Sequence, residues 1–350
     1  MNSVCPYSAQ EQWKFIRIHL KNQNGRRPKM ELKEIKLEDM EAQSFIEEQC
    51  QTISSEVGDS IAINALSGGV DSSVVSMLGH RALGDKLKTY FIDNGIMREG
   101  EPEYVVSIIE KCGVPVELID AQDEFFEALK GKTDPEEKRQ AITDTFYKSV
   151  FGRLVRESGT RFLLQGTNFT DVEETVAGIK RQHNILAQLG IDTEAAYGYK
   201  VIEPIIQLRK PAVRALGKAL GLPREIFNRP PFPGPALAAR VIGETTRERI
   251  ELVKKATAVV EQELAGTDAF QYLAILHEDR VTGIRDAARD YGFQIEVRCW
   301  DSEDAVTGSP TRLPYEILEK LASRITSEVS GVVSVTYNIS SKPPSTIEAV

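Results

Sequence analysis

The sequence predicts an α/β protein: a parallel, doubly wound sheet in its first part and a smaller α+β domain in its last part. Two observations carry this prediction. Short apolar runs alternate with segments of helical spacing over 41–228, which is typical of a parallel sheet covered by helices. At 229–235, four prolines and a glycine in seven residues interrupt both patterns. We therefore expect an extension over 1–40, a first domain over 41–228 and a second domain over 229–350.

The elements of the first domain follow from their spacing. Strands in this order predict a sheet whose ligands bind at the carboxyl ends of its strands. The expected elements are a helix from about Met40 to Val57, a strand over 61–66, a helix reaching His80, a strand over 87–92, a helix over 101–111, a strand over 114–119, a helical stretch over 136–157 and a strand ending at Gly166.

The second domain has a different pattern, in which helices and strands do not alternate regularly. This texture predicts a small α+β domain without internal repeats. We expect a helix over 246–264, strands near 272–276 and 293–299, a helix over 315–329 and a strand over 332–339.

Composition excludes several classes of protein. No run of eighteen uncharged apolar residues is present, and the opening residues lack the apolar core of a signal peptide, so we expect a cytoplasmic protein without a membrane partner. The net charge of −9 gives no general attraction for polyanions, so we expect no nucleic-acid partner. The four cysteines lie far apart, which favours free thiols over a metal or disulfide framework.

The strongest local signal is the run Ser67–Ser72, which joins a buried strand to a helix. Glycines let the backbone approach a phosphate, serines donate hydroxyl hydrogen bonds, and the helix start is electropositive. This combination favours pyrophosphate binding. Asp71 fits such a loop if it holds a magnesium ion, and otherwise it is a helix-capping residue. The spacings of kinase-type phosphate loops and of dinucleotide-binding turns are absent.

Leu66–Ser73 resembles the PP-loop of the N-type ATP pyrophosphatases, and the chain from about residue 40 onward resembles the ATP-pyrophosphatase part of the GMP synthase family. Several motifs occur in the order of that family, which makes the resemblance far more specific than one loop. They are 91–98, 165–167, 179–180, 183–184, 229–235 and 342–348.

The resemblance implies a reaction and its site residues. ATP, the cosubstrate, would adenylate the C2 oxygen of xanthosine monophosphate (XMP) with Mg²⁺ as cofactor, and ammonia would then displace AMP to give GMP. The positions that match catalytic residues are Asp71, Asp171, Glu174, Lys180 and His183, with Asp71 and Asp171 as metal ligands. The positions that match ATP and pyrophosphate contacts are Ser67, Gly68, Gly69, Val70, Ser72, Ser73, Asp93 and Gly166. The positions that match acceptor contacts are Arg229, Pro233, Gly234, Arg289, Lys342, Ile347 and Glu348.

The resemblance also implies partners. The second domain resembles the family's dimerisation domain, so we expect a homodimer. No glutaminase motif occurs in the chain, so ammonia would be free or supplied by a separate glutamine amidotransferase subunit.

The residues leave other interpretations open. Glu174, Lys180 and His183 could be surface groups, and 342–348 a frayed tail. The chain departs from the family's motifs at 167–171 and 180–188, carries an added stretch at 189–198, has Pro230 and Ala236 where the family has histidine and glycine, and ends differently. The alternative is therefore a PP-loop enzyme with another acceptor or nucleophile, such as an ATP-dependent sulfur transferase or an amide-forming enzyme. Cys112 and Cys299 are expected to be structural.

A third interpretation is a non-catalytic nucleotide-binding regulator. A pure binder has no need of metal ligands or of a lysine that stabilises charge on a phosphate. Asp71, Asp171 and Lys180 therefore speak against it.

Overall fold

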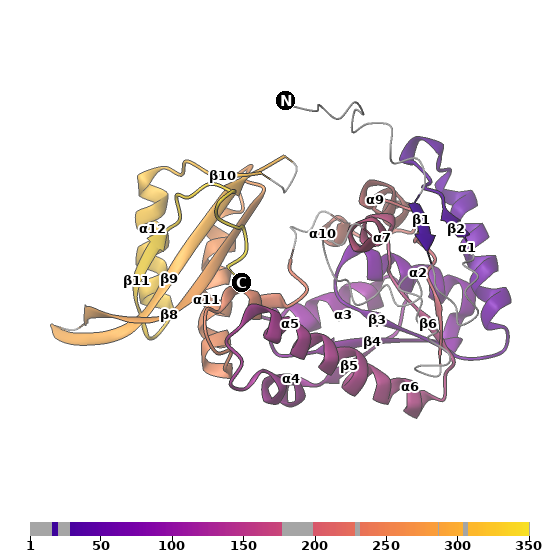
Figure 1. Cartoon of the computed structure of the whole chain (residues 1–350), viewed down its shortest axis with the longest axis horizontal. Helices are drawn as coiled ribbons and strands as arrows, with labels where there is room; N and C mark the ends of the chain where they lie inside the picture. The colour runs from indigo at the N-terminus through magenta and orange to yellow at the C-terminus, as the bar shows by residue number, and fades with distance from the viewer. Residues whose placement is uncertain are drawn as a thin grey trace, which may run out of the picture. The chain divides into compact units, whose positions relative to one another are not determined.

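The computed structural model describes residues 16–19, 29–176, 199–227, 232–285, 287–303 and 307–349, and Figure 1 shows its elements. The chain divides into two compact units. The first contains residues 1–92, 105–119 and 151–229, and the second contains 93–104, 120–150 and 230–350. Segments that precede the predicted boundary at 228/229 thus belong to the second unit, and that boundary remains a prediction.

A five-stranded sheet forms the centre of the first unit, in the order β5-β4-β3-β6-β7. The pairs β3–β4, β3–β6 and β6–β7 are parallel, with Ile63 opposite both Lys88 and Leu163. The predicted doubly wound parallel sheet is confirmed. The strands are β3 (Ala62–Leu66), β4 (Leu87–Asp93), β5 (Val116–Asp120), β6 (Phe162–Leu164) and β7 (Lys200–Ile202).

The strand order creates a switch point between β3 and β6. The chain first winds outward from β3 through β4 to β5, and then returns to the other side of β3 with β6 and β7. Because crossovers between parallel strands are right-handed, the helix between β3 and β4 and the helix that precedes β6 cover opposite faces. The loops that follow β3 and β6 diverge at their carboxyl ends, where doubly wound proteins bind ligands.

Three mutually contacting helices cover one face of this sheet: α1 (Ala42–Val57), α2 (Val70–Leu83) and α9 (Lys210–Ala219). Their apolar residues recur at helical spacing, as in α2, where Val74, Val75 and Leu78 are buried. Figure 1 shows α6 (Gly152–Ser158) on the other side of the strands. The burial of these faces fixes α2, and with it the loop that precedes it.

The expected helix over 136–157 is three segments in the structure: α5 (Pro135–Asp144), a π-helical stretch (Thr145–Phe151) and α6. Val150 and Phe151 are both almost fully buried, and the wide π turn changes the phase of the helix at that point. Further elements were not predicted. They are β1 (Ile16–His19), β2 (Lys29–Leu32), α4 (Gln122–Leu129), α7 (Phe169–Val176), β7, α9, α10 (Arg224–Phe227) and the two-residue strand β10 (Ser309–Pro310).

The second unit contains a four-stranded sheet built around β9 (Ala288–Asp301). It pairs antiparallel with β8 (Gln271–Arg285) and β10 (Ser309–Pro310), and parallel with β11 (Val332–Tyr337). The helices α11 (Arg247–Leu264) and α12 (Tyr315–Glu328) contact each other and the strands β8 and β11. The expected α+β domain is thus confirmed, but its β8–β9 hairpin is much longer than predicted and projects from the sheet (Figure 1).

Candidate active site

The predicted phosphate loop lies at the switch point of the sheet, between β3 and α2. Gly68 has a φ of 76°, a conformation that side chains disfavour. Gly69 caps α2 without a side-chain hydrogen bond, so no side chain of the cap occupies the electropositive start of the helix. Ser72 Oγ accepts from the Ser67 N–H at 3.1 Å and lies 3.0 Å from Ser67 Oγ, which closes the loop. The geometry suits an anion at the start of α2.

Asp71 lies in the first turn of α2, and its two carboxylate oxygens have different surroundings. Its Oδ2 lies 3.4 Å from both Asn168 Nδ2 and Lys210 Nζ. Its Oδ1 is buried and has no hydrogen-bond partner among the described residues. A buried carboxylate oxygen without a partner is unfavourable unless a cation binds it, and magnesium prefers such oxygens. The residues present therefore fit a magnesium ion.

Asn168 connects Asp71 with the second predicted metal ligand, Asp171. Its side chain is fully buried at the start of α7, where its Oδ1 accepts from the N–H groups of Thr170 (2.9 Å) and Asp171 (3.2 Å). Asp171 Oδ2 in turn accepts from the Asn168 N–H at 3.0 Å. The structure thus brings both carboxylates to one asparagine. The sequence patterns did not reveal Asn168, although asparagine just before a helix is a common cap.

Gly166 holds the loop after β6 against the phosphate loop. A Cβ at this position would lie 3.1 Å from the carbonyl carbon of Asp71 and 3.1 Å from the N atom of Ser72. Both are backbone atoms of α2 and cannot rotate away. Gly166, predicted as a pyrophosphate contact, is therefore also a packing contact between the two loops at the switch point.

Lys210 is a second residue that the sequence patterns did not reveal. It is the first residue of α9, and its ammonium group reaches Asp71 Oδ2 although half of its side chain is exposed. No motif in the sequence links it to the phosphate loop, because the contact depends on how α9 packs against α2. Its positive charge stands beside the start of α2, where a pyrophosphate would need one.

Some of the remaining residues predicted to bind ATP or to act in catalysis form hydrogen bonds within their own turns, and others are not described. Ser73 Oγ donates to the Gly69 carbonyl at 2.9 Å, and Val70 begins α2. Asp93 ends β4, and its two oxygens accept from the Gly95 N–H and from Gln122 Nε2, so it shapes its own turn. Outside the described residues lie Lys180, His183 and the side chain of Glu174.

In the second unit, two arginines hold the C-terminal segment 342–348. Arg240, almost fully buried, makes two hydrogen bonds of 3.1 Å to the Glu348 carboxylate, which also accepts from Gln271 Nε2 at 2.9 Å. Arg298 Nη1 donates to the carbonyl groups of Thr346, Ile347 and Glu348 at 2.7, 3.2 and 3.3 Å. The segment is therefore a fixed part of the unit and not a frayed tail.

Arg298 is itself oriented by Glu296, whose oxygens also bind His277 and Asn338. Burial by itself raises the pKa of Glu296, but the hydrogen bonds from His277 and Arg298 outweigh it and lower the pKa to about 2. The carboxylate is thus charged at neutral pH. Ile347 adds an apolar anchor, since it packs with Leu273, Ile275 and Trp300.

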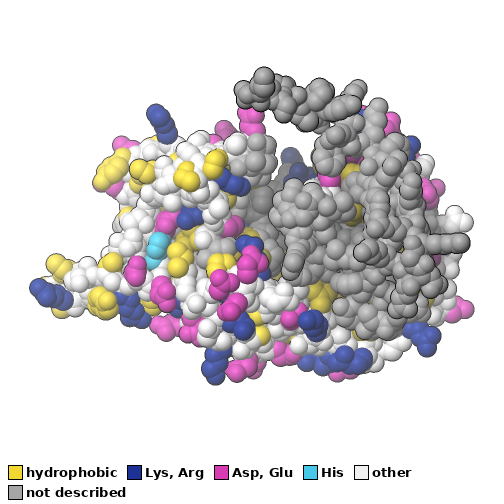
Figure 2. Space-filling view, in the orientation of Figure 1, with side chains coloured by type: hydrophobic (Ala, Val, Ile, Leu, Met, Phe, Trp, Pro, Cys, Tyr) yellow, Lys and Arg dark blue, Asp and Glu magenta, His cyan; other side chains and the backbone are white. Residues whose placement is uncertain are grey.

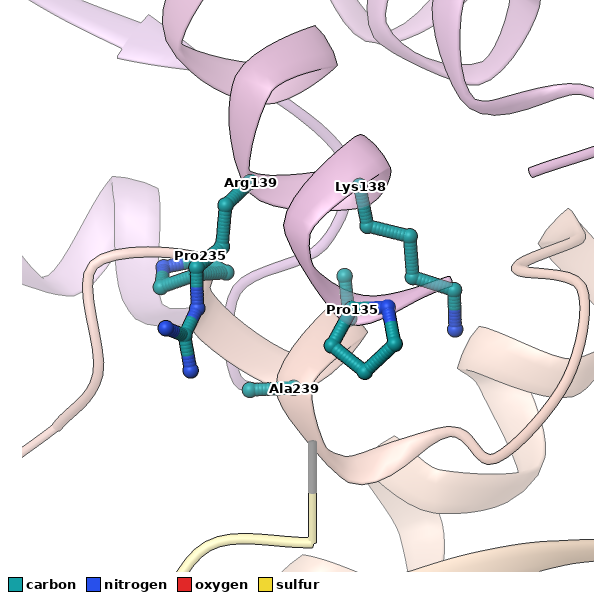
Figure 3. Close-up of a pocket in the computed structure, with 6 residues that line it drawn as sticks. Pro135, Lys138, Arg139, Pro235 and Ala239 are labelled. Carbon is teal, nitrogen blue, oxygen red and sulfur yellow. The ribbon is translucent and has the colours of Figure 1, made fainter. Parts of the chain in front are cut away.

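A shallow hollow lies beside the segment that follows the proline-rich run (Figure 3). It is lined by residues of α5 and of the short helix η4 (Ala236–Arg240), whose last residue is the Arg240 that binds Glu348. The Lys138 ammonium group points out of the hollow to the Val241 carbonyl at 2.7 Å, and burial lowers its pKa to about 8. The lining residues are Pro135, Lys138, Arg139, Pro235, Ala238 and Ala239.

The predicted acceptor residues are brought together only in part. Pro233 and Gly234 lie in the turn before η4, and η4 carries Arg240 with Glu348. Lys342 pairs with Gly308 through its backbone. Arg229 lies outside the described residues.

Arg289 is far from this group along the β8–β9 hairpin. It pairs with Ile284, whereas Glu348 binds Gln271 at the other end of β8, 13 residues away. A strand rises about 3.3 Å per residue, so the two ends lie on the order of 40 Å apart. One copy of the chain therefore does not join Arg289 to the C-terminal segment.

Three further properties of the described part of the chain concern clusters of metal-ligating side chains, thiols and the apolar length of its helices. Over these residues, no three side chains of His, Cys, Asp or Glu cluster as metal ligands. Cys50, Cys112 and Cys299 are free thiols whose pKa is raised by burial, which disfavours reactive thiolates. None of the described helices is long and apolar enough to cross a membrane. Acidic and basic side chains are mixed over the face shown in Figure 2.

Comparison with known proteins gives concordant matches for both parts. The family model "NAD synthase" matches residues 41–239, and "GMP synthase C terminal domain" matches 258–349. A subunit of GMP synthase [glutamine-hydrolyzing] from Archaeoglobus fulgidus is 46% identical over 310 residues, 88% of this chain and 99% of that protein. The corresponding subunit from Methanothermobacter thermautotrophicus is 45% identical over 308 residues, 87% of this chain and 97% of that protein.

Two further matches differ in extent. The GMP synthase [glutamine-hydrolyzing] of Aeropyrum pernix is 41% identical over 313 residues, 87% of this chain and 60% of that protein. Among solved structures, an NH3-dependent NAD synthetase from Campylobacter jejuni in complex with the nitrate ion is 20% identical. It has a TM-score of 0.43, and the match covers 54% of this chain and 78% of that one.

The switch-point loop, the sheet around it and the match to the NAD synthase model define an ATP-dependent ligase of the PP-loop class. The two archaeal subunits specify it further, because they match almost over their whole length. The chain belongs to the family of these GMP synthase subunits.

Proposed function

We propose that this protein adenylates the C2 carbonyl oxygen of XMP with ATP and lets ammonia displace AMP, which gives GMP. A ring carbonyl oxygen is a poor leaving group. Attack of this oxygen on the α-phosphorus expels pyrophosphate and turns the oxygen into part of AMP, which then leaves when ammonia forms the new C–N bond. The names of the relatives, with their 46% and 45% identity, support this substrate assignment.

The observation that carries the proposal is the buried Oδ1 of Asp71, in the first turn of α2, which has no hydrogen-bond partner within the described ranges. Asp71 and Asp171, both bound to Asn168, would hold a magnesium ion that neutralises the charge of the departing pyrophosphate. The start of α2 and the ammonium group of Lys210 would bind the pyrophosphate itself. The hydroxyl groups of Ser67 and Ser72 add donors at the same loop.

The test is a direct assay. The purified chain is incubated with ATP, magnesium, XMP and ammonium, and AMP, pyrophosphate and GMP are followed by chromatography. We expect GMP in equal amount to AMP, and a loss of at least about 100-fold in Asp71→Asn. Asp59→Asn is the matched control, since Asp59 is fully exposed and its ion pair is with Lys86 on the surface. Absence of GMP and of XMP-stimulated pyrophosphate release would refute the proposal.

We propose further that ammonia comes from a separate glutamine amidotransferase subunit. The two archaeal relatives are named as single subunits of a glutamine-hydrolyzing enzyme, which in those proteins implies a further subunit. The chain alone should then use ammonium and not glutamine. GMP formation by the chain alone from glutamine would contradict this.

A homodimer would complete the acceptor site. Arg289 lies far from the C-terminal segment of its own chain, and Ile284 and Tyr291 on the same hairpin are 81% and 63% exposed, as expected for an interface. Figure 2 shows hydrophobic and basic side chains on the projecting end of this hairpin. Arg289 of a second copy would then bind the acceptor phosphate.

Mixing of two inactive variants tests the dimer. Arg289→Ala and Asp71→Asn, unfolded and refolded together, should recover up to about a quarter of native activity, because half of the dimers are hybrids with one intact site. No recovery in hybrids that form would place Arg289 in the site of its own chain or outside it.

A further inference from the structure

A short segment near the N-terminus, residues 32–35, packs against the helix that carries Asp171. Leu32 contacts the buried pair Phe169 and Val172 on α7. Both family models leave residues 1–40 unmatched. The segment therefore lies outside the regions that the family models match, and it contacts the helix that carries Asp171.

Backbone contacts fix this segment in one position. The Ile35 N–H donates to the Gln207 carbonyl at 3.0 Å, and Ile35 forms a parallel bridge with Leu208. Gln207 Nε2 donates in return to the Lys33 carbonyl at 3.2 Å. The side chains of residues 32–34 thus project from an ordered strand-like stretch and not from a loose tail.

Arg209 joins the segment to α7. Its Nη1 and Nη2 donate to the two oxygens of Glu173 at 2.7 and 2.8 Å, and its Nε donates to Glu34 at 3.0 Å. The guanidinium lies 4.9 Å from the centre of the Phe169 ring. These groups are only 23–35% exposed, so their hydrogen bonds are stronger than those of surface pairs. The hydrogen bonds to Glu173 and to Glu34 together hold the Arg209 side chain in one orientation.

Arg209 lies between two elements that carry residues of the candidate active site, so its hydrogen bonds bear on catalysis. Arg209 caps α9, and the next residue, Lys210, reaches Asp71. Glu173 lies on α7 only two residues after Asp171. One guanidinium therefore spans the two elements that carry the groups around the proposed metal.

We propose that Glu34 is a positioning residue: by binding Arg209 it holds α7, and thereby Asp171, in register with Asp71. The inference rests on the proposed function for its catalytic consequence, but not for its structural one. When Glu34 is neutralised, the Arg209 Nε–H has at most a neutral acceptor, which binds a guanidinium more weakly than a carboxylate does. The guanidinium and the helix then gain freedom.

The structural test uses the full-length chain without ligands. Hydrogen–deuterium exchange is measured for peptides that cover α7 in the native protein, Glu34→Gln and Glu38→Gln. Glu38 is the matched control, because it lies close by in the chain and its 3.6 Å pair with Lys36 is exposed. We expect exchange in α7 to be about five- to tenfold faster in Glu34→Gln and within about twofold of native in Glu38→Gln. Unchanged exchange of α7 in Glu34→Gln would overturn the inference.

The catalytic test separates turnover from binding. In Glu34→Gln we expect kcat for XMP-dependent AMP formation to fall about five- to tenfold, with KM for ATP within about twofold of native. KM for ATP should change little because the hydrogen bond of Glu34 to Arg209 lies outside the phosphate loop. The serine hydroxyl groups of that loop form their hydrogen bonds within the loop. A raised KM at unchanged kcat would overturn the role in positioning.

The proposed function and the positioning role of Glu34 can each be refuted without the other. A native protein that forms no GMP would refute the proposed function, and the exchange result would still decide whether Glu34 holds α7. A second variant, Leu32→Ala, removes the apolar contact and should accelerate the same peptides. Acceleration spread evenly over the first unit in either variant would indicate general destabilisation and contradict the inference.

Discussion

Gly166 lies against Asp71 so closely that a Cβ at position 166 would be 3.1 Å from the Asp71 carbonyl carbon. This contact joins the loops that follow β3 and β6, which the strand order places at the switch point of the sheet. The distance is set by the two backbones, because neither atom belongs to a side chain that could turn away. The candidate site is therefore built on packed backbone.

Gly166→Ala should destabilise the protein by about 1–3 kcal/mol, since the added methyl group forces α2 and the β6–α7 loop apart. Gly69→Ala is the matched control. Its φ is −80° and its Cβ would meet only Ser67 Oγ at 3.5 Å, so stability should stay within about 0.5 kcal/mol. Urea unfolding measures both. If the two variants are equally stable, the close approach at Gly166 is not a constraint.

Asn168→Ser should separate the cap of α7 from the contact with Asp71. Serine keeps an oxygen acceptor for the Thr170 and Asp171 N–H groups but cannot donate an amide to Asp71, so we expect near-native stability and a several-fold higher magnesium concentration for half-maximal activity. Asn168→Ala should in addition cost about 1 kcal/mol of stability. A serine variant with native magnesium dependence would contradict the bridging role.

Lys210→Gln should raise KM for ATP about tenfold without a change in stability, because its half-exposed side chain contributes charge to the phosphate site and little to packing. Steady-state kinetics in ATP measures the effect. Lys218→Gln, near the end of the same helix, is the control and should behave as native. Equal KM values for the two variants would remove Lys210 from the site.

Glu348→Gln should weaken acceptor binding more than ATP binding. The change leaves the buried Arg240 guanidinium without a charged partner, so we expect a stability loss of about 3 kcal/mol and a KM for XMP raised about tenfold at unchanged KM for ATP. Glu328→Gln, at an exposed end of α12, is the control and should have little effect. A proportional rise in both KM values would argue against a local effect on the acceptor.

Because of Glu296, the free energy of unfolding should decrease as the pH falls below 4.5. Its folded pKa of about 2 lies below the ordinary value of 4.5, so its contribution is complete above pH 4.5 and is lost as the pH falls from 4.5 towards 2. Glu296→Gln should therefore cost about 2 kcal/mol at pH 7 and progressively less at pH 4 and pH 3. Urea unfolding at each pH tests this, and a difference that is constant with pH would contradict it.

Local patterns predicted much of the first unit. The apolar run 61–66, the glycines and serines that follow it and the helical spacing up to His80 are sufficient to predict β3, the phosphate loop and α2, which ends at Leu83. The helix predicted over 136–157 was wrong in its middle, because the π turn there depends on burial of both Val150 and Phe151. The β8–β9 hairpin was too short in the prediction, since polar residues such as His277 and Arg280 hide the strand pattern and only pairing reveals it.

The sequence by itself determined the fold class and the phosphate loop with Asp71, because each depends on residues close together in the chain. Asp171 as a second metal ligand came from the family resemblance and stays a prediction. Only the tertiary structure decided the contacts within each unit. In the first unit they are Asn168 between the carboxylates, Lys210 beside Asp71 and Glu34 on Arg209, and in the second unit Arg240 on Glu348. These contacts join residues far apart in sequence. They exist because the sheet order and helix packing bring distant segments together, which no local periodicity encodes.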